Sequence, residues 1–301
     1  MTPNATTGTH LAAEVASQPD SWARAAPLAA RYHALLPQPG ERVAVIGCGT
    51  SLFMARAIAE LRETRGHGLT DAWSAAALRT DRDYDRYLVI CRSGTTTDVL
   101  DALRALPENI PRTVITSSPA TPVLDLADPI LIAEADELSI VQTRFATTTL
   151  AILRSHLGED LTDVVGQARA VLAADLADLD RMRRVEQITF VGTGIGAALA
   201  EEAALKLRES CQAWTEAYSI AEWRHGPASI AAPGRAVWAF GPTPPGLHAE
   251  VAATGADYIH HRIDPMAELV RLHRLCLVRA ADAGLDPDRP RGLSRSVILA
   301  S

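Results

Sequence analysis

The chain has 301 residues, 48% of them hydrophobic, which is enough for two compact domains of ordinary size. Aromatic residues make up only 5%, and this balance favours helices packed on sheets over an all-β sandwich. The formal net charge of −7 argues against nucleic acid as the main partner, because binding a phosphate backbone needs a positive face.

Several absences narrow the class of protein further. No apolar run approaches the roughly 20 residues needed to span a bilayer, so we expect no membrane partner. Residues 1–17 have neither the basic start nor the apolar core of a secretory signal. The four cysteines lie far apart and form no CxxC pair, and no His/Cys/Asp cluster has metal-ligand spacing. We therefore expect a cytoplasmic protein with no metal and no cofactor.

The first half of the chain predicts helices that alternate with short apolar strands. The residues before Pro37 are predicted to be helical, and the Pro- and Gly-containing stretch 37–40 ends that pattern. Strands are expected at 42–47, 87–91, 112–118 and 129–135, and helices at 52–65 and 96–106. Continuous apolar strands between helices are typical of a parallel sheet covered on both faces.

The same pattern then repeats. A long helical region at about 147–184 leads to a strand at 187–192 and a helix at 197–214, with later strands at 236–241 and 257–262. The duplication predicts an α/β fold with two domains, residues 1–168 and 169–301, each a parallel sheet flanked by helices.

Three turns rich in glycine and hydroxyl residues follow predicted strands, at the carboxyl ends where open α/β sheets bind ligands. They are GCGTS (47–51), CRSGTTT (91–97) and GTGIG (192–196). In the second turn, four hydroxyl side chains surround Gly94 at a helix N-terminus, where free N–H groups and the helix dipole also favour an anion. Serine and threonine most often only cap a helix, but four hydroxyls beside Arg92 favour a phosphate site.

A dinucleotide site is the competing interpretation of these turns. The first turn lacks the third glycine of the fingerprint, because Leu52 stands in that place. Residues 192–197 fit the relaxed G-x-G-x-x-G/A pattern, but the stretch that should end in an acidic residue roughly 20 residues later is predicted to be helical. No Walker A motif is present, so a dinucleotide is the weaker interpretation.

Three charged residues of one predicted helix share a face. Glu202, Lys206 and Glu209 are spaced i, i+4, i+7, and the alanines and leucines around them predict that this helix is largely buried. Buried charges must be paired or line a cavity, whereas a solvated Glu–Lys pair is the usual role of such spacing. Farther on, His225 precedes Gly-Pro in a constrained turn, where imidazole could exchange protons near neutral pH, although an ordinary loop histidine is the commoner case.

These segments resemble the SIS (sugar isomerase) superfamily. CGTS (48–51), RSGTTTD (92–98) and EEAALKLRES…EAYSIAEWRHGP (201–227) are similar to the isomerase half of glucosamine-6-phosphate synthase and to single-chain sugar-phosphate isomerases and deaminases. The likeness runs from Glu14 to Val297. It implies two tandem SIS domains and an amino-sugar 6-phosphate as the partner. No glutamine amidotransferase domain precedes these motifs, so we expect no ammonia production from glutamine.

The resemblance also implies roles for single residues. Glu209 matches the family's catalytic base at C1–C2, Lys206 the lysine beside it, and His225 the histidine linked to ring opening. Glu202 shares the face of this pair. Because the family supplies that histidine across a dimer interface, a homodimer is expected. Phosphate or substrate contacts are implied for the residues of the first two turns, namely Gly49, Thr50, Ser51, Cys91, Arg92, Ser93 and Thr96.

The chain departs from the family pattern at several of these positions. Cys91 and Arg92 stand where serine and glutamine are usual, and Gln142 lies in a region where the synthase carries serine and threonine. Arg295 takes the place of a lysine that forms a Schiff base with a ketose phosphate, and arginine cannot do that chemistry. The synthase reaction is therefore disfavoured, while the base that acts on C2 is retained.

The specific reaction favoured by this pattern is that of an N-acetylglucosamine-6-phosphate dehydratase, because elimination needs no imine. An aldose–ketose isomerase or a deaminase of glucosamine or galactosamine 6-phosphate is the first alternative. A phosphosugar-binding sensor without catalysis is the second. Sensors usually carry a DNA-binding module, and the chain shows no basic N-terminal helix-turn-helix, which favours an enzyme.

Overall fold

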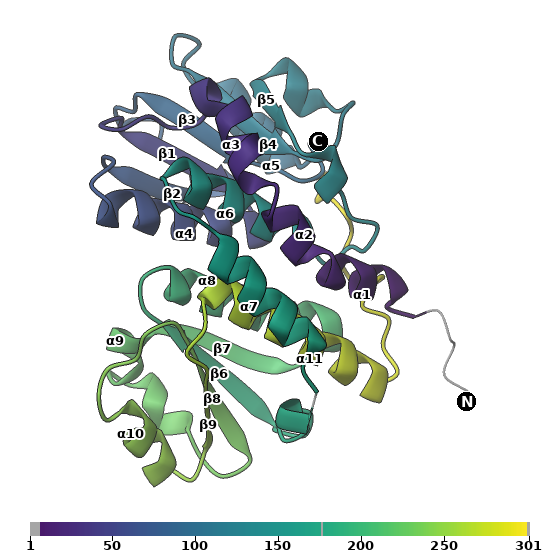
Figure 1. Cartoon of the computed structure of the whole chain (residues 1–301). Coiled ribbons are helices and arrows are strands. Elements are labelled where there is room, and N and C mark those ends of the chain that lie inside the picture. Colours follow the sequence, from purple (N-terminus) through teal and green to yellow (C-terminus); the bar gives the residue numbers. More distant parts are fainter. Residues whose placement is uncertain (1–6, 176, 300–301) are drawn as a thin grey trace. The chain divides into compact units, whose positions relative to one another are not determined.

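The computed structural model describes residues 7–175 and 177–299 (Figure 1). They fall into two compact units, each with its own parallel sheet, as the α/β duplication predicts. The five-stranded unit consists of Asp20–Glu137, Gln142–Thr162 and Ser294–Ser301. The four-stranded unit consists of Met1–Pro19, Leu138–Val141 and Asp163–Leu293.

This division differs from the predicted boundary between residues 168 and 169. The chain passes from the five-stranded unit to the four-stranded unit between Thr162 and Asp163. The N-terminal segment nevertheless belongs to the four-stranded unit, and the segment from Ser294 onward belongs to the five-stranded unit. The N-terminal segment is held in the four-stranded unit by side chains near the C-terminus. The Leu11 amide, for example, donates a 2.8 Å hydrogen bond to the Asp288 carboxylate. Such long-range capping leaves no periodic signal in the sequence.

The five-stranded sheet has the strand order β2-β1-β3-β4-β5, with all neighbours parallel. Its strands are β1 (Val43–Gly47), β2 (Thr70–Ser74), β3 (Arg86–Ile90), β4 (Arg112–Thr116) and β5 (Asp128–Leu131). The central strands β1 and β3 are buried throughout, which explains why their apolar runs were predictable. The edge strand β2 has the half-polar sequence TDAWS and is only partly buried, so it was missed.

Helices cover both faces of this sheet (Figure 1). The helices of the unit are α3 (Ala25–Arg31), α4 (Thr50–Thr64), α5 (Thr97–Ala105) and α6 (Arg144–His156). On one face, α4 packs on β1 and β2 and is itself covered by α6, which also contacts α3. On the other face, Val99 and Leu103 of α5 join a cluster with Ala44, Ile46 and Val89 of the sheet.

The four-stranded sheet has the order β7-β6-β8-β9, again parallel throughout. Its strands are β6 (Gln187–Gly192), β7 (Trp214–Ser219), β8 (Arg235–Phe240) and β9 (Asp257–His260). The helix predicted over 197–214 is α8 (Ile195–Cys211), and it stops earlier because Gln212 adopts the left-handed conformation, with φ 55°. The following residues form β7, an edge strand that the sequence did not predict.

Both faces of this second sheet are covered as well (Figure 1). Its helices are α1 (Thr9–Ala16), α7 (Thr162–Ala173), α8, α9 (Ile220–Trp223), α10 (Leu247–Ala253) and α11 (Pro265–Asp282). The two longest, α8 and α11, pack on each other, and α1 packs on α11. On the opposite face, Ile220 and Trp223 of α9 and Val251 of α10 contact Val191 and Val237 of the sheet.

The two helical regions predicted as continuous are interrupted. The region 147–184 contains α6, then α7 (Thr162–Ala173) and a 3₁₀ turn at Ala177–Leu179. Gly158 follows α6 with φ 84°, and Asp160 accepts hydrogen bonds from the Thr162 amide and hydroxyl, which restarts the helix. The N-terminal region is likewise divided into α1, α2 (Gln18–Trp22), α3 and a 3₁₀ turn at His33–Leu35. Within the described residues, none of the helices combines the length and apolar character that a membrane crossing requires.

Candidate active site

The turn between β3 and α5 brings several hydroxyl side chains together. Gly94 lies at its centre with φ 66°, and a Cβ there would come within 2.1 Å of Thr121 Oγ1, so this turn requires glycine. Ser93 Oγ lies 3.4 Å from Thr96 Oγ1 and accepts a 3.3 Å hydrogen bond from the Thr95 amide. The structure thus brings together two of the predicted phosphate residues, Ser93 and Thr96, at the start of α5. We call residues 93–96 the hydroxyl turn.

The C-terminal tail contacts the hydroxyl turn directly. Ser296 Oγ lies 2.9 Å from Thr95 Oγ1, and 3.3 Å from both Ser93 Oγ and Thr96 Oγ1. The amide of Thr97, the first residue of α5, donates a 3.1 Å hydrogen bond to the Val297 carbonyl. The sequence did not indicate this contact, because the two segments are about 200 residues apart.

Arg92, directly before the hydroxyl turn, makes contacts with both its side chain and its backbone. Its side chain is buried and forms an ion pair with Glu137, with 3.5 Å between Nη1 and Oε2. Its backbone carbonyl accepts hydrogen bonds from the hydroxyls of Thr116, Ser117 and Ser118. Thr116 is the last residue of β4, and the two serines follow it. The Arg92 carbonyl thus links the ends of β3 and β4, and its guanidinium contacts Glu137 and the Arg295 carbonyl, while a contact of Arg92 with substrate stays a prediction.

Arg295 is anchored in the same framework. Its guanidinium donates hydrogen bonds to the Glu137 carbonyl and to the Asp136 carboxylate. Burial alone would raise the pKa of Asp136, but hydrogen bonds from Ser117 and Arg295 outweigh it and hold that pKa below its usual value. Arg295 thus pairs with a carboxylate whose ionised form is favoured.

The first glycine turn begins α4 two residues earlier than predicted. A Cβ on Gly47 would lie 2.6 Å from the Ser51 backbone, so this close approach of strand and helix requires glycine. Gly49 is the N-cap, with φ 55°, and Thr50 and Ser51 are buried in the first turn. Cys91 directly follows β3, with its Sγ 3.9 Å from Ser93 Oγ. The predicted phosphate residues of both turns therefore lie at the carboxyl ends of β1 and β3, which are neighbours in the sheet.

Gln142 adds a polar group to this unit. Its side-chain oxygen is buried, and within residues 7–175 and 177–299 it has no hydrogen-bond partner. The next residue, Thr143, donates its amide and hydroxyl to Glu137 at 2.6 and 3.1 Å. A buried acceptor without a partner is costly, so Gln142 is suited to receive a ligand hydroxyl.

The charged face of α8 belongs to the four-stranded unit. The side chains of Glu202 and Lys206 are each only 1% exposed, with 3.4 Å between Nζ and Oε1. Lys206 also forms an ion pair with Glu209, whose side chain is 18% exposed. The predicted burial is thus confirmed. One ammonium group lies between a buried carboxylate and a carboxylate that reaches solvent.

A buried histidine that the sequence did not single out lies close to this triad. His273 of α11 is fully buried, and its Nδ1 lies 3.1 Å from the Gln18 side-chain nitrogen. Burial, and secondarily the charge of Lys206, lowers the pKa of His273 to about 3, so its imidazole is neutral. A single histidine in an apolar helix carries no sequence signal of this kind.

His225 lies in the exposed turn after α9. Its amide donates a 2.9 Å hydrogen bond to the Glu222 carbonyl. Its imidazole has no hydrogen bond or ion pair to any other residue that the structure describes. The structure brings Glu202, Lys206 and Glu209 together within the four-stranded unit, but it does not add His225 to that group.

Comparisons with known proteins identify distant relatives of the chain. No family model matches the chain. It is 25% identical over 331 aligned positions to the glutamine–fructose-6-phosphate aminotransferase (isomerizing) of Tropheryma whipplei, covering 86% of this chain and 52% of that protein. It is 26% identical over 312 positions to the Pyrobaculum aerophilum enzyme of the same name, with 85% and 51% covered. The chain therefore spans about half the length of the curated relatives it matches.

Solved structures share the fold across nearly the whole chain. The glucosamine-6-phosphate deaminase of Thermotoga maritima matches with a TM-score of 0.78 at 21% identity, covering 97% of this chain and 100% of that one. The tagatose-6-phosphate ketose/aldose isomerase of Escherichia coli matches with a TM-score of 0.77 at 20% identity, covering 98% and 99%. The chain therefore shares the fold of these sugar-phosphate enzymes, with its two parallel sheets.

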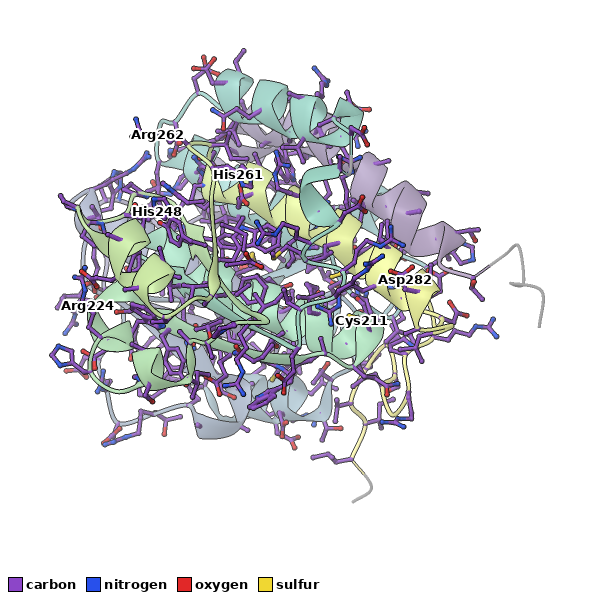
Figure 2. All side chains as sticks on the ribbon, turned by 90° about the horizontal axis from the view of Figure 1, so that it is seen from below. Cys211, Arg224, His248, His261, Arg262 and Asp282 are labelled. Carbon is purple, nitrogen blue, oxygen red and sulfur yellow. The ribbon has the colours of Figure 1, made fainter. Side chains whose placement is uncertain are left out.

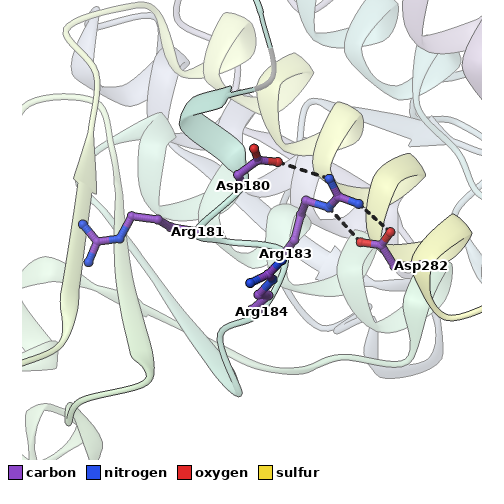
Figure 3. Close-up of a pocket in the computed structure, with 5 residues that line it drawn as sticks. All are labelled: Asp180, Arg181, Arg183, Arg184 and Asp282. Atoms are coloured by element: carbon purple, nitrogen blue, oxygen red, sulfur yellow. Dashed lines mark hydrogen bonds and ion pairs between the residues drawn. The ribbon is translucent and has the colours of Figure 1, made fainter.

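One cavity of the four-stranded unit contains none of the predicted site residues. It measures about 670 Å³ and is lined by Asp180, Arg181, Arg183, Arg184 and Asp282 (Figure 3). Arg183 donates to both Asp282 oxygens, at 2.8 and 2.6 Å, and to Asp180 at 3.1 Å. These side chains are exposed, and Arg183 is paired with both carboxylates, so this cavity is a solvated surface feature.

A second cavity of this half, of about 550 Å³, lies at the carboxyl ends of β8 and β9. His260, His261 and Arg262 line part of it, and Figure 2 labels the latter two. His261 Nδ1 lies 2.8 Å from Glu268, a buried carboxylate that also accepts from Trp238. In neither half do the described residues gather three His, Cys, Asp or Glu side chains suited to a metal ion.

Proposed function

We propose that the chain is a sugar-phosphate enzyme whose base, Glu209, abstracts the C2 proton of an open-chain amino-sugar 6-phosphate. The observation that carries this proposal is the charged face of α8. Lys206 is buried between Glu202 and Glu209, and of the two carboxylates only that of Glu209 reaches solvent. A proton-abstracting base must be accessible to the substrate, and Glu209 meets this requirement.

The remaining predicted residues take supporting roles in this proposal. Ser51, Ser93 and Thr96 bind the phosphate, with backbone N–H groups at the N-termini of α4 and α5 as further donors. His225 assists ring opening. A base positioned in this way contributes roughly 10²–10⁴-fold to the rate. As in the family, we propose that the active form is a homodimer.

The fate of the intermediate decides the reaction. Reprotonation at C1 gives a ketose, and loss of nitrogen after isomerisation gives a deaminase. Elimination instead moves the C2 proton to Glu209, forms a C2–C3 double bond and breaks the C3–O bond. The leaving hydroxyl and the proton taken up by Glu209 together make one molecule of water, which leaves Glu209 ionised again. Arg295 stands where imine chemistry would need a lysine, and its guanidinium is paired with Asp136. This supports elimination, and hence an N-acetylglucosamine-6-phosphate dehydratase.

The isomerase and deaminase alternatives draw on the relatives. The names of the matching solved structures include a glucosamine-6-phosphate deaminase and a ketose/aldose isomerase. All three reactions share the abstraction of a proton next to a carbonyl, so the role of Glu209 is common to them. They differ in product and in whether the amino group is acetylated.

Proton NMR in D₂O separates these reactions from one another and from a binding protein. N-Acetylglucosamine 6-phosphate and glucosamine 6-phosphate are incubated separately with the protein. We expect the C2 proton signal of the acetylated sugar to disappear and vinylic signals to appear. Ketose signals without release of ammonia would assign an isomerase, and ketose signals with ammonia release, measured in a separate assay, would assign a deaminase. Line broadening without exchange for either sugar would contradict the enzyme and favour a phosphosugar sensor.

A further inference from the structure

The two sheets repeat one topology. The order β2-β1-β3-β4 in the first sheet matches β7-β6-β8-β9 in the second, and all neighbouring strands are parallel. The loops after β3 and β4 therefore correspond to the loops after β8 and β9. The hydroxyl turn follows β3, and the cavity of about 550 Å³ lies at the corresponding place in the four-stranded unit. Open α/β sheets bind ligands at this edge.

Hydrogen bonds within the unit hold the walls of this cavity. His260 Nε2 donates to the Gly241 carbonyl at 2.9 Å, which ties the end of β9 to the loop after β8. The Thr193 hydroxyl donates to the Pro242 carbonyl at 2.9 Å, which ties the same loop to the glycine turn before α8. The cavity is therefore formed without a ligand, and its volume lies within the range of roughly 300–1,000 Å³ that is usual for small-molecule sites.

Two nitrogen-bearing side chains of the cavity suit a phosphate group (Figure 2). Arg262 is exposed, and its guanidinium has no hydrogen bond or ion pair to any other residue that the structure describes. Beside it, His261 Nδ1 lies 2.8 Å from Glu268 Oε1, and the Glu268 side chain is only 1% exposed. A buried carboxylate on one ring nitrogen fixes the orientation of the imidazole. A planar guanidinium can donate to two phosphate oxygens at once.

The other polar residues of the cavity suit the hydroxyl groups of a sugar. Asp264, Gln167 and Thr243 supply a carboxylate, an amide and a hydroxyl group. The Asp264 amide donates to Gln167 Oε1 at 2.6 Å, which holds these two residues together. Carboxylates accept hydrogen bonds from hydroxyl groups, and amide NH₂ groups donate to them. The lining thus matches a phosphate group at Arg262 and a polyhydroxy body beside it.

This cavity and Glu209 are at opposite ends of α8. A Cβ on Gly196 would come within 2.4 Å of the Phe240 carbonyl oxygen, so the start of α8 contacts the end of β8, next to the cavity. At 1.5 Å per residue, the stretch of α8 from Gly196 to Glu209 measures about 20 Å. A ligand in the cavity is therefore separate from a sugar whose C2 proton is within reach of Glu209.

We propose that this cavity is a second binding site, in which Arg262 and His261 bind the phosphate group of a small phosphorylated sugar. The inference goes beyond the proposed function and does not depend on it, because the cavity shares no residue with the hydroxyl turn or with the charged face of α8.

Imidazole NMR of the protein labelled with ¹³C-histidine tests this site. His261→Gln identifies the His261 signal. At constant pH, we expect that signal to shift with saturation as glucosamine 6-phosphate is added, and to stay in place with unphosphorylated glucosamine. No shift with the phosphate ester, or an equal shift with glucosamine, would overturn the proposal.

The matched charge variants are Arg262→Gln and Arg184→Gln. Both arginines are exposed in the four-stranded unit, but Arg184 lies outside this cavity. Because hydrogen bonds to a charged group are the stronger kind, we expect Arg262→Gln to weaken the binding seen at His261 roughly tenfold or more. Arg184→Gln should bind as wild type does. Equal affinities of the two variants would refute the role of Arg262.

Thr96→Val separates this site from the phosphate site proposed at the hydroxyl turn. The His261 shift should persist in this variant with an affinity near that of wild type. Its loss would show that the signal reports binding at the hydroxyl turn, and would overturn the inference. A His261 shift in wild type without exchange of the C2 proton would contradict the proposed function and support the second site.

Discussion

Replacement of Lys206 by methionine removes the positive charge from the buried face of α8. Lys206 and Glu202 are each 1% exposed, and their charged atoms are 3.4 Å apart. Methionine keeps most of the length and apolar volume of the lysine stem, so the change acts mainly on charge. It leaves the Glu202 carboxylate in a site from which water is excluded. Glu209, which is partly exposed, can compensate by hydration.

The size of the effect follows from this geometry. At an effective dielectric constant of about 20, two unit charges at this separation attract each other by roughly 5 kcal/mol. Breaking a buried pair by removing one partner typically costs about 3–5 kcal/mol. We therefore expect Lys206→Met to lower the free energy of unfolding by about 3–5 kcal/mol, a large share of the usual 5–15 kcal/mol of a domain.

Urea denaturation followed by tryptophan fluorescence measures this loss, because Trp214, Trp223 and Trp238 all lie in the four-stranded unit. The double variant Glu202→Gln/Lys206→Met removes both charges and should recover most of the lost stability. The reasoning is refuted if Lys206→Met lies within about 1 kcal/mol of wild type, or if the double variant is as unstable as the single one.

Two further predictions concern the backbone conformation of Gly94 and the protonation of His273. Gly94→Ala should lower the melting temperature and weaken phosphate binding, because φ 66° costs a non-glycine residue about 1–2 kcal/mol and the new Cβ would meet Thr121. Gly166→Ala is the control, because Gly166 lies in a helix with open space around it. An unchanged melting temperature for Gly94→Ala would contradict the predicted backbone strain. His273 has a folded pKa of about 3, below its unfolded value near 6.5, so its contribution to stability is complete above pH 6.5. Between pH 6.5 and about 3 stability should fall by up to roughly 1.4 kcal/mol per pH unit, and His273→Leu should reduce that slope in urea titrations; an equal slope in the variant would contradict the assignment.

The parts of the fold that the sequence predicted are those set by local pattern. The strands β1, β3, β6 and β8 are continuous apolar runs, because both of their faces are covered. The edge strands β2 and β7 mix polar and apolar residues and gave no such signal. The assignment of both chain ends to their units depends on single long-range contacts, such as those of Asp288 and Arg295, which no periodicity encodes.

In the candidate site, too, local patterns were predictable from the sequence and long-range contacts were not. Glu202, Lys206 and Glu209 were predictable as one helix face, since their spacing fixes their alignment whatever the rest of the chain does. For Arg92 the sequence gave the position but not the partner, because Glu137 is 45 residues away. The contact of Ser296 with the hydroxyl turn could not be predicted from the sequence either, because the two segments are about 200 residues apart.

Exchange of the C2 proton by Glu209→Gln tests the central claim most directly. The variant keeps the size of the side chain and removes its basicity. With the substrate identified by NMR in D₂O, the account predicts that exchange slows by roughly 10²-fold or more, while sugar-phosphate affinity and melting temperature stay near those of wild type. Undiminished exchange by Glu209→Gln would show that another group is the base and would contradict the account.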